Sequence, residues 1–177
     1  MKYLLITLFS FTISFAQSPK RMVKKIGTNP IFFIDSISVE KEDLQKYNPN
    51  EISSVTVYKD KNAYDLLGED GKDGVVYIET KKFCKNRYWK YFTSKSTEYQ
   101  NLVNSTDDNN VQYIINDRVL NENFEGDLAA IDDKVFKSIK FISKELLLKE
   151  YKIEDKDFGF QIISDTPKDL YHGNKKF

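Results

Sequence analysis

The sequence predicts an α+β fold of two repeated units, each with the order ββαβαβ, a small mixed sheet and short flanking helices. Short apolar or β-branched runs separated by turn residues are typical of strands. The outline of these runs recurs after about 80–85 residues, which is longer than a solenoid period and indicates a domain duplication. Aromatic residues make up 14% of the chain, so it has enough large side chains to build a core.

The first residues resemble a cleaved export signal. Lys2 precedes an apolar run from Tyr3 to Phe15, and Ser14-Phe15-Ala16 offers small residues at the positions that a signal peptidase reads. The run is shorter than the ~20 residues of a membrane-spanning helix, and no later segment is long and apolar enough to span. We therefore expect residues 1–16 to be removed, the chain to begin at Gln17, and the protein to be periplasmic or otherwise exported.

The charge balance argues against a nucleic-acid binder. The full chain carries 27 basic and 27 acidic residues, and removal of Lys2 with the signal leaves a net charge of −1. Proteins that bind nucleic acids usually show a clear basic excess. Residues 17–29 form a polar, basic lead-in to the first unit.

The first unit, here called unit one, is expected over residues 30–83. The apolar run Ile31–Ile34 has the length of a buried strand, and Asp35-Ser36 suggests a two-residue hairpin turn into a short strand, Ile37–Val39. Consecutive apolar positions, here and in Val75–Ile78 of the closing strand Val75–Thr80, predict strands that are central in the sheet or covered on both faces.

The middle of unit one alternates short helices and a strand. Glu40–Tyr47 is expected to form a short helix, and Asn48-Pro49-Asn50-Glu51 begins a second one, with Asn48 as cap and Glu51 completing a capping box. Val55–Tyr58 is a β-branched and aromatic strand. Asn62 is expected to cap a helix that stops at Gly68.

Residues 84–110 are expected to join the units as an aromatic and basic connector followed by a polar linker, residues 105–110. We interpret the aromatic stretch as an edge strand that covers the junction of the two units, with Tyr88, Lys90 and Phe92 on one face. Alternatively, cations interleaved with aromatic rings bind partners, sugars or membrane interfaces. The candidate interaction surface consists of Arg87, Tyr88, Trp89, Lys90, Tyr91 and Phe92.

Unit two is expected over residues 111–166 as a degenerate copy. Its strands correspond to residues 112–117, 136–141 and 159–164, and Ser143 is expected to cap a helix that runs from Lys144 to about Tyr151. Residues 167–177 look like a tail.

Unit one resembles the plug domain of TonB-dependent outer-membrane receptors. Five blocks match in order: Phe33-Ile34-Asp35, Asn48-Pro49-Asn50-Glu51-Ile52, Val55-Thr56-Val57-Tyr58-Lys59, Leu67-Gly68 and Gly74-Val75-Val76-Tyr77-Ile78-Glu79-Thr80-Lys81. Ser36 replaces the usual Gly and Leu67 the usual Tyr. The resemblance implies a small mixed sheet with short helices. The chain is too short for the receptors' barrel, so it resembles a free-standing plug-like protein.

The residue inventory favours neither an enzyme nor a metal or cofactor site. His172 and Cys84 are the single histidine and cysteine, so the sequence supports no zinc site and no nucleophile–base set. Cys84 could be a buried apolar residue, an intermolecular link or a reactive thiol, and we expect it to be buried and inert. An acidic cluster between residues 60 and 73 lacks the spacing of a calcium loop and is best interpreted as a solvated turn.

These observations lead to one main functional hypothesis and two alternatives. The chain is expected to be an exported, non-catalytic module that binds another cell-envelope protein, with a role as accessory to an outer-membrane uptake or secretion complex. It could instead bind a small ligand or glycan through the aromatic connector. A decayed receptor fragment is the third interpretation.

Overall fold

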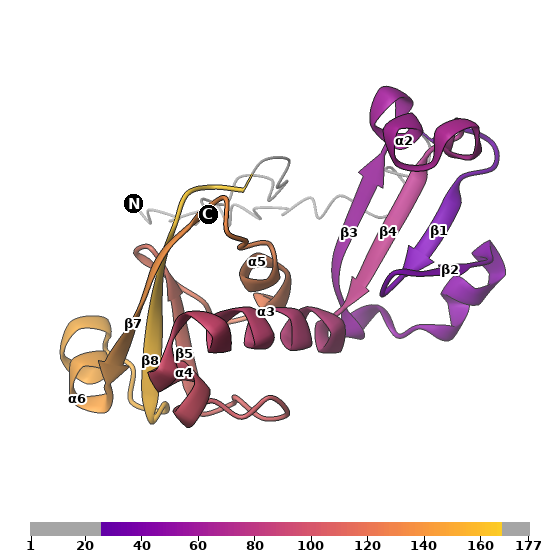
Figure 1. The fold of residues 1–177 in the computed structure, drawn as a ribbon. Coiled ribbons are helices and arrows are strands. Elements are labelled where there is room, and N and C mark those ends of the chain that lie inside the picture. The colour runs from indigo at the N-terminus through magenta and orange to yellow at the C-terminus, as the bar shows by residue number, and fades with distance from the viewer. Residues whose placement is uncertain (1–25, 168–177) are drawn as a thin grey trace, which may run out of the picture.

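The computed structural model describes residues 26–167, which form two four-stranded mixed sheets connected by helices (Figure 1). The strand order is β2-β1-β4-β3 in the first sheet and β6-β5-β8-β7 in the second. In both sheets the two central strands are parallel and each edge strand is antiparallel to its neighbour. The predicted α+β fold with two repeated units is therefore confirmed.

Unit one begins with the expected hairpin. Asp35 and Ser36 form its turn with φ angles of 50° and 71°, the left-handed conformation that two-residue hairpin turns require. The elements of this unit are β1 (Ile31–Ile34), β2 (Ile37–Val39), the 3-10 turns η1 (Lys41–Lys46) and η2 (Pro49–Glu51), β3 (Ile52–Tyr58), α2 (Asp60–Leu67), the 3-10 turn η3 (Gly68–Gly71) and β4 (Val75–Thr80).

Three details of unit one differ from the sequence-based expectations. Asn48 does accept a hydrogen bond from the Asn50 amide (3.0 Å), but η2 is a single 3-10 turn because β3 starts immediately after it. Helix α2 begins at Asp60, ahead of the predicted cap Asn62, although it ends at Gly68 (φ 62°) as expected. Strands β1 and β4 are central, yet β1 is buried only at alternate positions.

The connector is helical, so its interpretation as an edge strand is wrong. Helix α3 (Lys81–Lys95) follows β4 directly, and α4 (Thr97–Leu102) follows α3. The Thr80 hydroxyl caps α3 by accepting a hydrogen bond from the Phe83 amide (3.1 Å). Cys84, Tyr88 and Phe92 are buried, and their spacing of four residues places them on one helical face.

Unit two repeats the order of unit one. Ser143 caps its second helical segment by accepting a hydrogen bond from the Leu146 amide (3.4 Å), as expected. The elements are β5 (Val111–Ile115), β6 (Arg118–Val119), α5 (Glu125–Ala129), β7 (Phe136–Ser143), α6 (Lys144–Leu146), the π-helical turn η4 (Leu147–Tyr151) and β8 (Phe158–Ser164).

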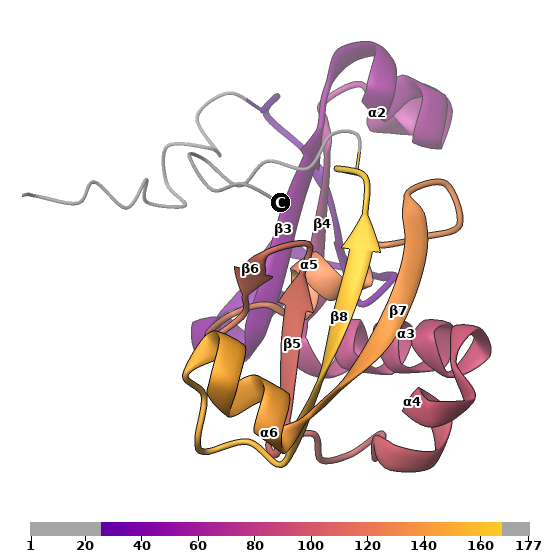
Figure 2. The same cartoon turned by 90° about the vertical axis from the view of Figure 1, so that its left-hand side faces the viewer.

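The larger hydrophobic core lies between the second sheet and the connector. Rings from α3 and α4 pack with rings from β5 and β8, including Tyr88, Phe92, Tyr99, Tyr113 and Phe160. The opposite face of the sheet is covered by Leu147 of η4, which packs on Ile114 and Ile142. Figure 2 shows α6 in front of the second sheet and α3 behind it. The connector is therefore structurally part of unit two.

Candidate functional site

Helix α3 distributes the six predicted interaction residues around its circumference. Tyr88 and Phe92 are core residues with 1% and 0% exposure, whereas Arg87 and Lys90 are exposed and Trp89 and Tyr91 are half-buried. The Trp89 Nε1 donates a hydrogen bond to the Val103 carbonyl (3.0 Å), and its ring packs on the core beneath α3. The six side chains therefore do not form one continuous exposed surface.

Asp108, from the expected polar linker, is buried at the centre of a hydrogen-bond network that sequence reasoning missed. The hydroxyls of Tyr88 and Tyr113 donate to its Oδ2 (2.7 and 3.0 Å), and Lys85 Nζ lies 2.5 Å from Oδ1. The Tyr99 hydroxyl lies 3.0 Å from that of Tyr113. The network joins α3 and α4 to β5, so it anchors the connector on unit two.

The chemistry of this network favours a structural role. Burial, followed by the nearby Asp108 carboxylate, raises the pKa of Tyr88, and burial raises the pKa of Tyr99 and Tyr113. Phenols held neutral in this way are weak bases and nucleophiles. An open depression of about 340 Å³ lies beside Asp108, but the hydrogen bonds above already engage both oxygens of that carboxylate.

Glu79 of β4 connects the two units. Arg87 binds it through two nitrogens, one at 3.0 Å from Oε2, and also donates to the Ala129 carbonyl of α5 (3.2 Å). Ser54 of β3 donates to the same carboxylate (2.9 Å). Burial opposes ionisation of Glu79, but the Arg87 guanidinium outweighs it and lowers its pKa. Beside it, Cys84 is buried as expected, and burial raises its pKa to about 11.

The long edge strands of the two sheets differ in charge. Strand β7 carries Lys137 and Lys140, whereas no residue of β3 is charged. The ladders pair Val55 with Ile78 and Ile139 with Ile162, so Thr56 occupies the position of Lys140. Lysines on an edge discourage pairing with another strand. The edge of unit two has this protection, and the edge of unit one does not.

Helix α5 covers only the first half of β3. A Cβ atom on Gly126 would lie 3.2 Å from Ser53 Oγ and 3.4 Å from Ser54 Cβ. Beyond this contact Val55 is 44% exposed. Apart from the ladder with β4, no backbone hydrogen bond between elements of residues 26–167 involves residues 55–57. The second half of β3, residues 55–57, is here called the open edge.

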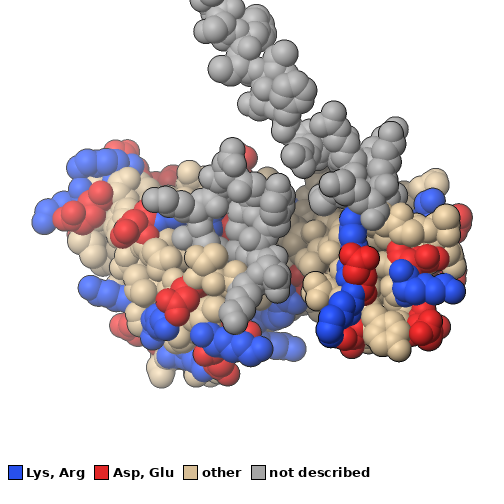
Figure 3. Space-filling view, turned by 90° about the horizontal axis from the view of Figure 1, so that it is seen from above, with Lys and Arg blue, Asp and Glu red and all other residues tan. Residues whose placement is uncertain are grey.

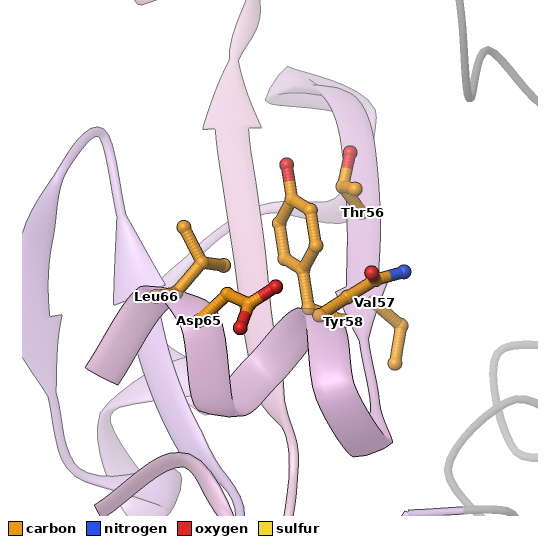
Figure 4. A pocket seen from close by; sticks show the side chains of 6 residues that line it. Thr56, Val57, Tyr58, Asp65 and Leu66 are labelled. Carbon is orange, nitrogen blue, oxygen red and sulfur yellow. The ribbon is translucent and has the colours of Figure 1, made fainter. Parts of the chain in front are cut away.

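A depression of about 380 Å³ adjoins the open edge and separates it from α2 (Figure 4). Thr56 and Tyr58 line it from the strand, and Asp65 and Leu66 from the helix. In Figure 4 the Asp65 carboxylate points toward Tyr58. The Tyr58 ring also contacts Tyr77 edge-on, with centroids 5.9 Å apart. The open edge and this depression form the candidate site.

Within residues 26–167, the rest of the surface offers no second candidate site. Basic and acidic side chains are intermixed on both lobes (Figure 3), in line with the balanced composition. Across residues 26–167, no three His, Cys, Asp or Glu side chains converge as a metal site. No helix in the same range is long and apolar enough to cross a membrane. The predicted export signal and His172 lie outside the described residues.

Comparisons with known protein families, characterised proteins and solved structures found no match for this chain. The similarity to plug domains therefore rests on the sequence blocks in unit one.

Proposed function

We propose that this chain is an exported, non-catalytic protein-interaction module that binds an extended segment of another cell-envelope protein at the open edge. The observation that carries the proposal is the contrast between the uncharged β3 and the lysine-protected β7. Adding a strand to a sheet edge supplies main-chain hydrogen bonds, and neighbouring pockets select the side chains. The open edge has such a depression beside it.

The plug-like sequence blocks and the apolar N-terminal run support a location in the cell envelope. On this proposal the protein is a periplasmic accessory, peripheral to an outer-membrane uptake or secretion complex. The glycan-binding alternative required the rings of the connector, and two of those rings, Tyr88 and Phe92, are core residues. The connector therefore offers fewer exposed rings to a glycan, and we prefer the open edge as the binding site.

Thr56→Lys tests the proposal, because it transfers the lysine of unit two to the equivalent position of unit one. Lys140→Thr is the matched control, since it changes the other edge in the opposite direction. Capture of envelope proteins by immobilised Thr56→Lys should fall at least tenfold, on the order of the ~1.4 kcal/mol that a tenfold change represents. Lys140→Thr should capture the same proteins as the unchanged chain.

A thermal melt of each variant separates lost binding from lost folding. A lysine fits the equivalent position of β7, so we expect the midpoint of Thr56→Lys to stay close to that of the unchanged chain. Undiminished capture by a folded Thr56→Lys variant would exclude the open edge as the binding site.

A further inference from the structure

We propose that the segment added to the open edge carries a lysine or arginine side chain, which lies in the depression between β3 and α2. This inference rests on the proposed function. A residue paired with Thr56 directs its side chain to the same face of the sheet as Thr56. On that face the depression is the nearest space, so the chemistry of its lining selects the partner side chain.

The lining suits a long side chain with an aliphatic stem and a cationic end. The ring of Tyr58 and the half-exposed side chain of Leu66 (47%) provide apolar walls for the stem. The Asp65 carboxylate provides a negative charge for the cationic end of the side chain, and the Tyr58 ring adds cation–π attraction. Lysine and arginine place methylene groups on apolar surface in this way while their charge remains at a polar edge.

The Asp65 carboxylate is accessible to a second cation. Its present partner is Lys61, one turn away on α2, and the exposures of the two side chains are 55% and 82%. An ion pair this exposed is weak. An incoming lysine or arginine can therefore share the Asp65 carboxylate with Lys61 or displace Lys61 from it. The segment that contains α2, residues 59–73, carries five acidic and three basic side chains. This excess of negative charge favours approach of a basic segment.

Two synthetic peptides test the charge preference directly. Both are acetylated, amidated heptapeptides of alternating threonine and valine, one with a central lysine and the other with a central glutamate. We expect the lysine peptide to bind the chain beginning at Gln17 about fivefold to tenfold more tightly, because attraction of lysine and repulsion of glutamate each contribute on the scale of an exposed ion pair. Fluorescence anisotropy of labelled peptides measures the ratio.

Asp65→Asn removes the charge while keeping the shape of the side chain. It should reduce the preference for lysine to within about twofold. Asp70→Asn is the matched control, because Asp70 is an exposed acid of the same unit outside the depression, and it should leave the preference unchanged. Equal binding of the two peptides, or a preference that persists in Asp65→Asn, would overturn the inference.

Thr56→Lys separates failure of this inference from failure of the proposed function. If the edge binds strands without regard to charge, both peptides bind equally and Thr56→Lys weakens both. That result overturns the lysine preference and leaves the proposed function standing. If neither peptide binds, or both bind Thr56→Lys undiminished, the open edge is not a strand-binding site and both proposals fall.

Discussion

At the scale of single residues, Asp108 is a buried acid that joins side chains of α3 and β5. It is only 9% exposed and accepts hydrogen bonds from two tyrosines and a lysine. A carboxylate removed from water is stable only when its oxygens are paired in this way. The segment around it, Ser-Thr-Asp-Asp-Asn-Asn, looks like an ordinary linker, because its composition does not reveal which acid turns inward.

Asp108→Ala should lower the free energy of unfolding by about 3–5 kcal/mol, because it leaves Lys85 and two phenols without their buried partner. Urea denaturation measures the change. Asp43→Ala is the control, since Asp43 pairs with Lys46 on the surface, where the side chains are 36% and 75% exposed. That change should shift the urea midpoint far less, because exposed ion pairs contribute little to stability. Similar losses in both variants would show that the network does not stabilise the fold.

At the scale of elements, the duplication extends to individual hydrogen bonds. The amides of Asp35 and Asn116 donate to the carbonyls of Ile78 and Ile162 (3.0 and 2.8 Å). Their side chains then accept from the amides of Thr80 and Ser164 (2.7 and 3.1 Å). Each hairpin turn is thus hydrogen-bonded to the end of the closing strand of its unit, β4 or β8. Both residues have positive φ, a conformation that Asp and Asn tolerate better than other non-glycine residues.

Asp35→Ala should cost about 2–4 kcal/mol, because it removes two hydrogen bonds to Thr80 and places alanine at positive φ. Asp35→Asn, which copies the residue of unit two, should cost less than about 1 kcal/mol. Chemical denaturation of the two variants gives the comparison. If the asparagine variant is as unstable as the alanine variant, the two turns are not equivalent.

The sequence predicted the sheets well and the connector poorly, for physical reasons. Strands such as Ile31–Ile34 are short apolar runs bounded by turn residues, and this local signal is strong. In α3 the helical signal was the spacing of Cys84, Tyr88 and Phe92, but the alternation of rings and lysines also fits a strand. The open edge could not be predicted, because it depends on which strand lies outermost and where α5 packs.

At the scale of the whole molecule, the two units have unequal cores. The largest cluster of buried side chains draws on α3, α4 and the second sheet, and it includes no residue of the first sheet among those described. The buried apolar side chains of unit one are fewer: Phe32, Ile34, Ala63, Val75 and Val76. Because hydrophobic stabilisation grows with buried apolar area, we expect unit one to be the less stable part. The open edge lies in that part.

Amide hydrogen exchange of the intact chain tests this difference. Within residues 26–167, the amides of β5 and β8 should exchange at least about tenfold more slowly than those of β1 and β4, because local opening is easier where fewer apolar contacts must break. Helix α3 should exchange with unit two, on whose core it packs. Uniform protection across both sheets would mean that the Glu79–Arg87 junction makes the units unfold together. In that case Arg87→Ala, which removes the hydrogen bonds to Glu79 and Ala129, should make the amides of the first sheet exchange faster than those of the second. Unit one could then open alone.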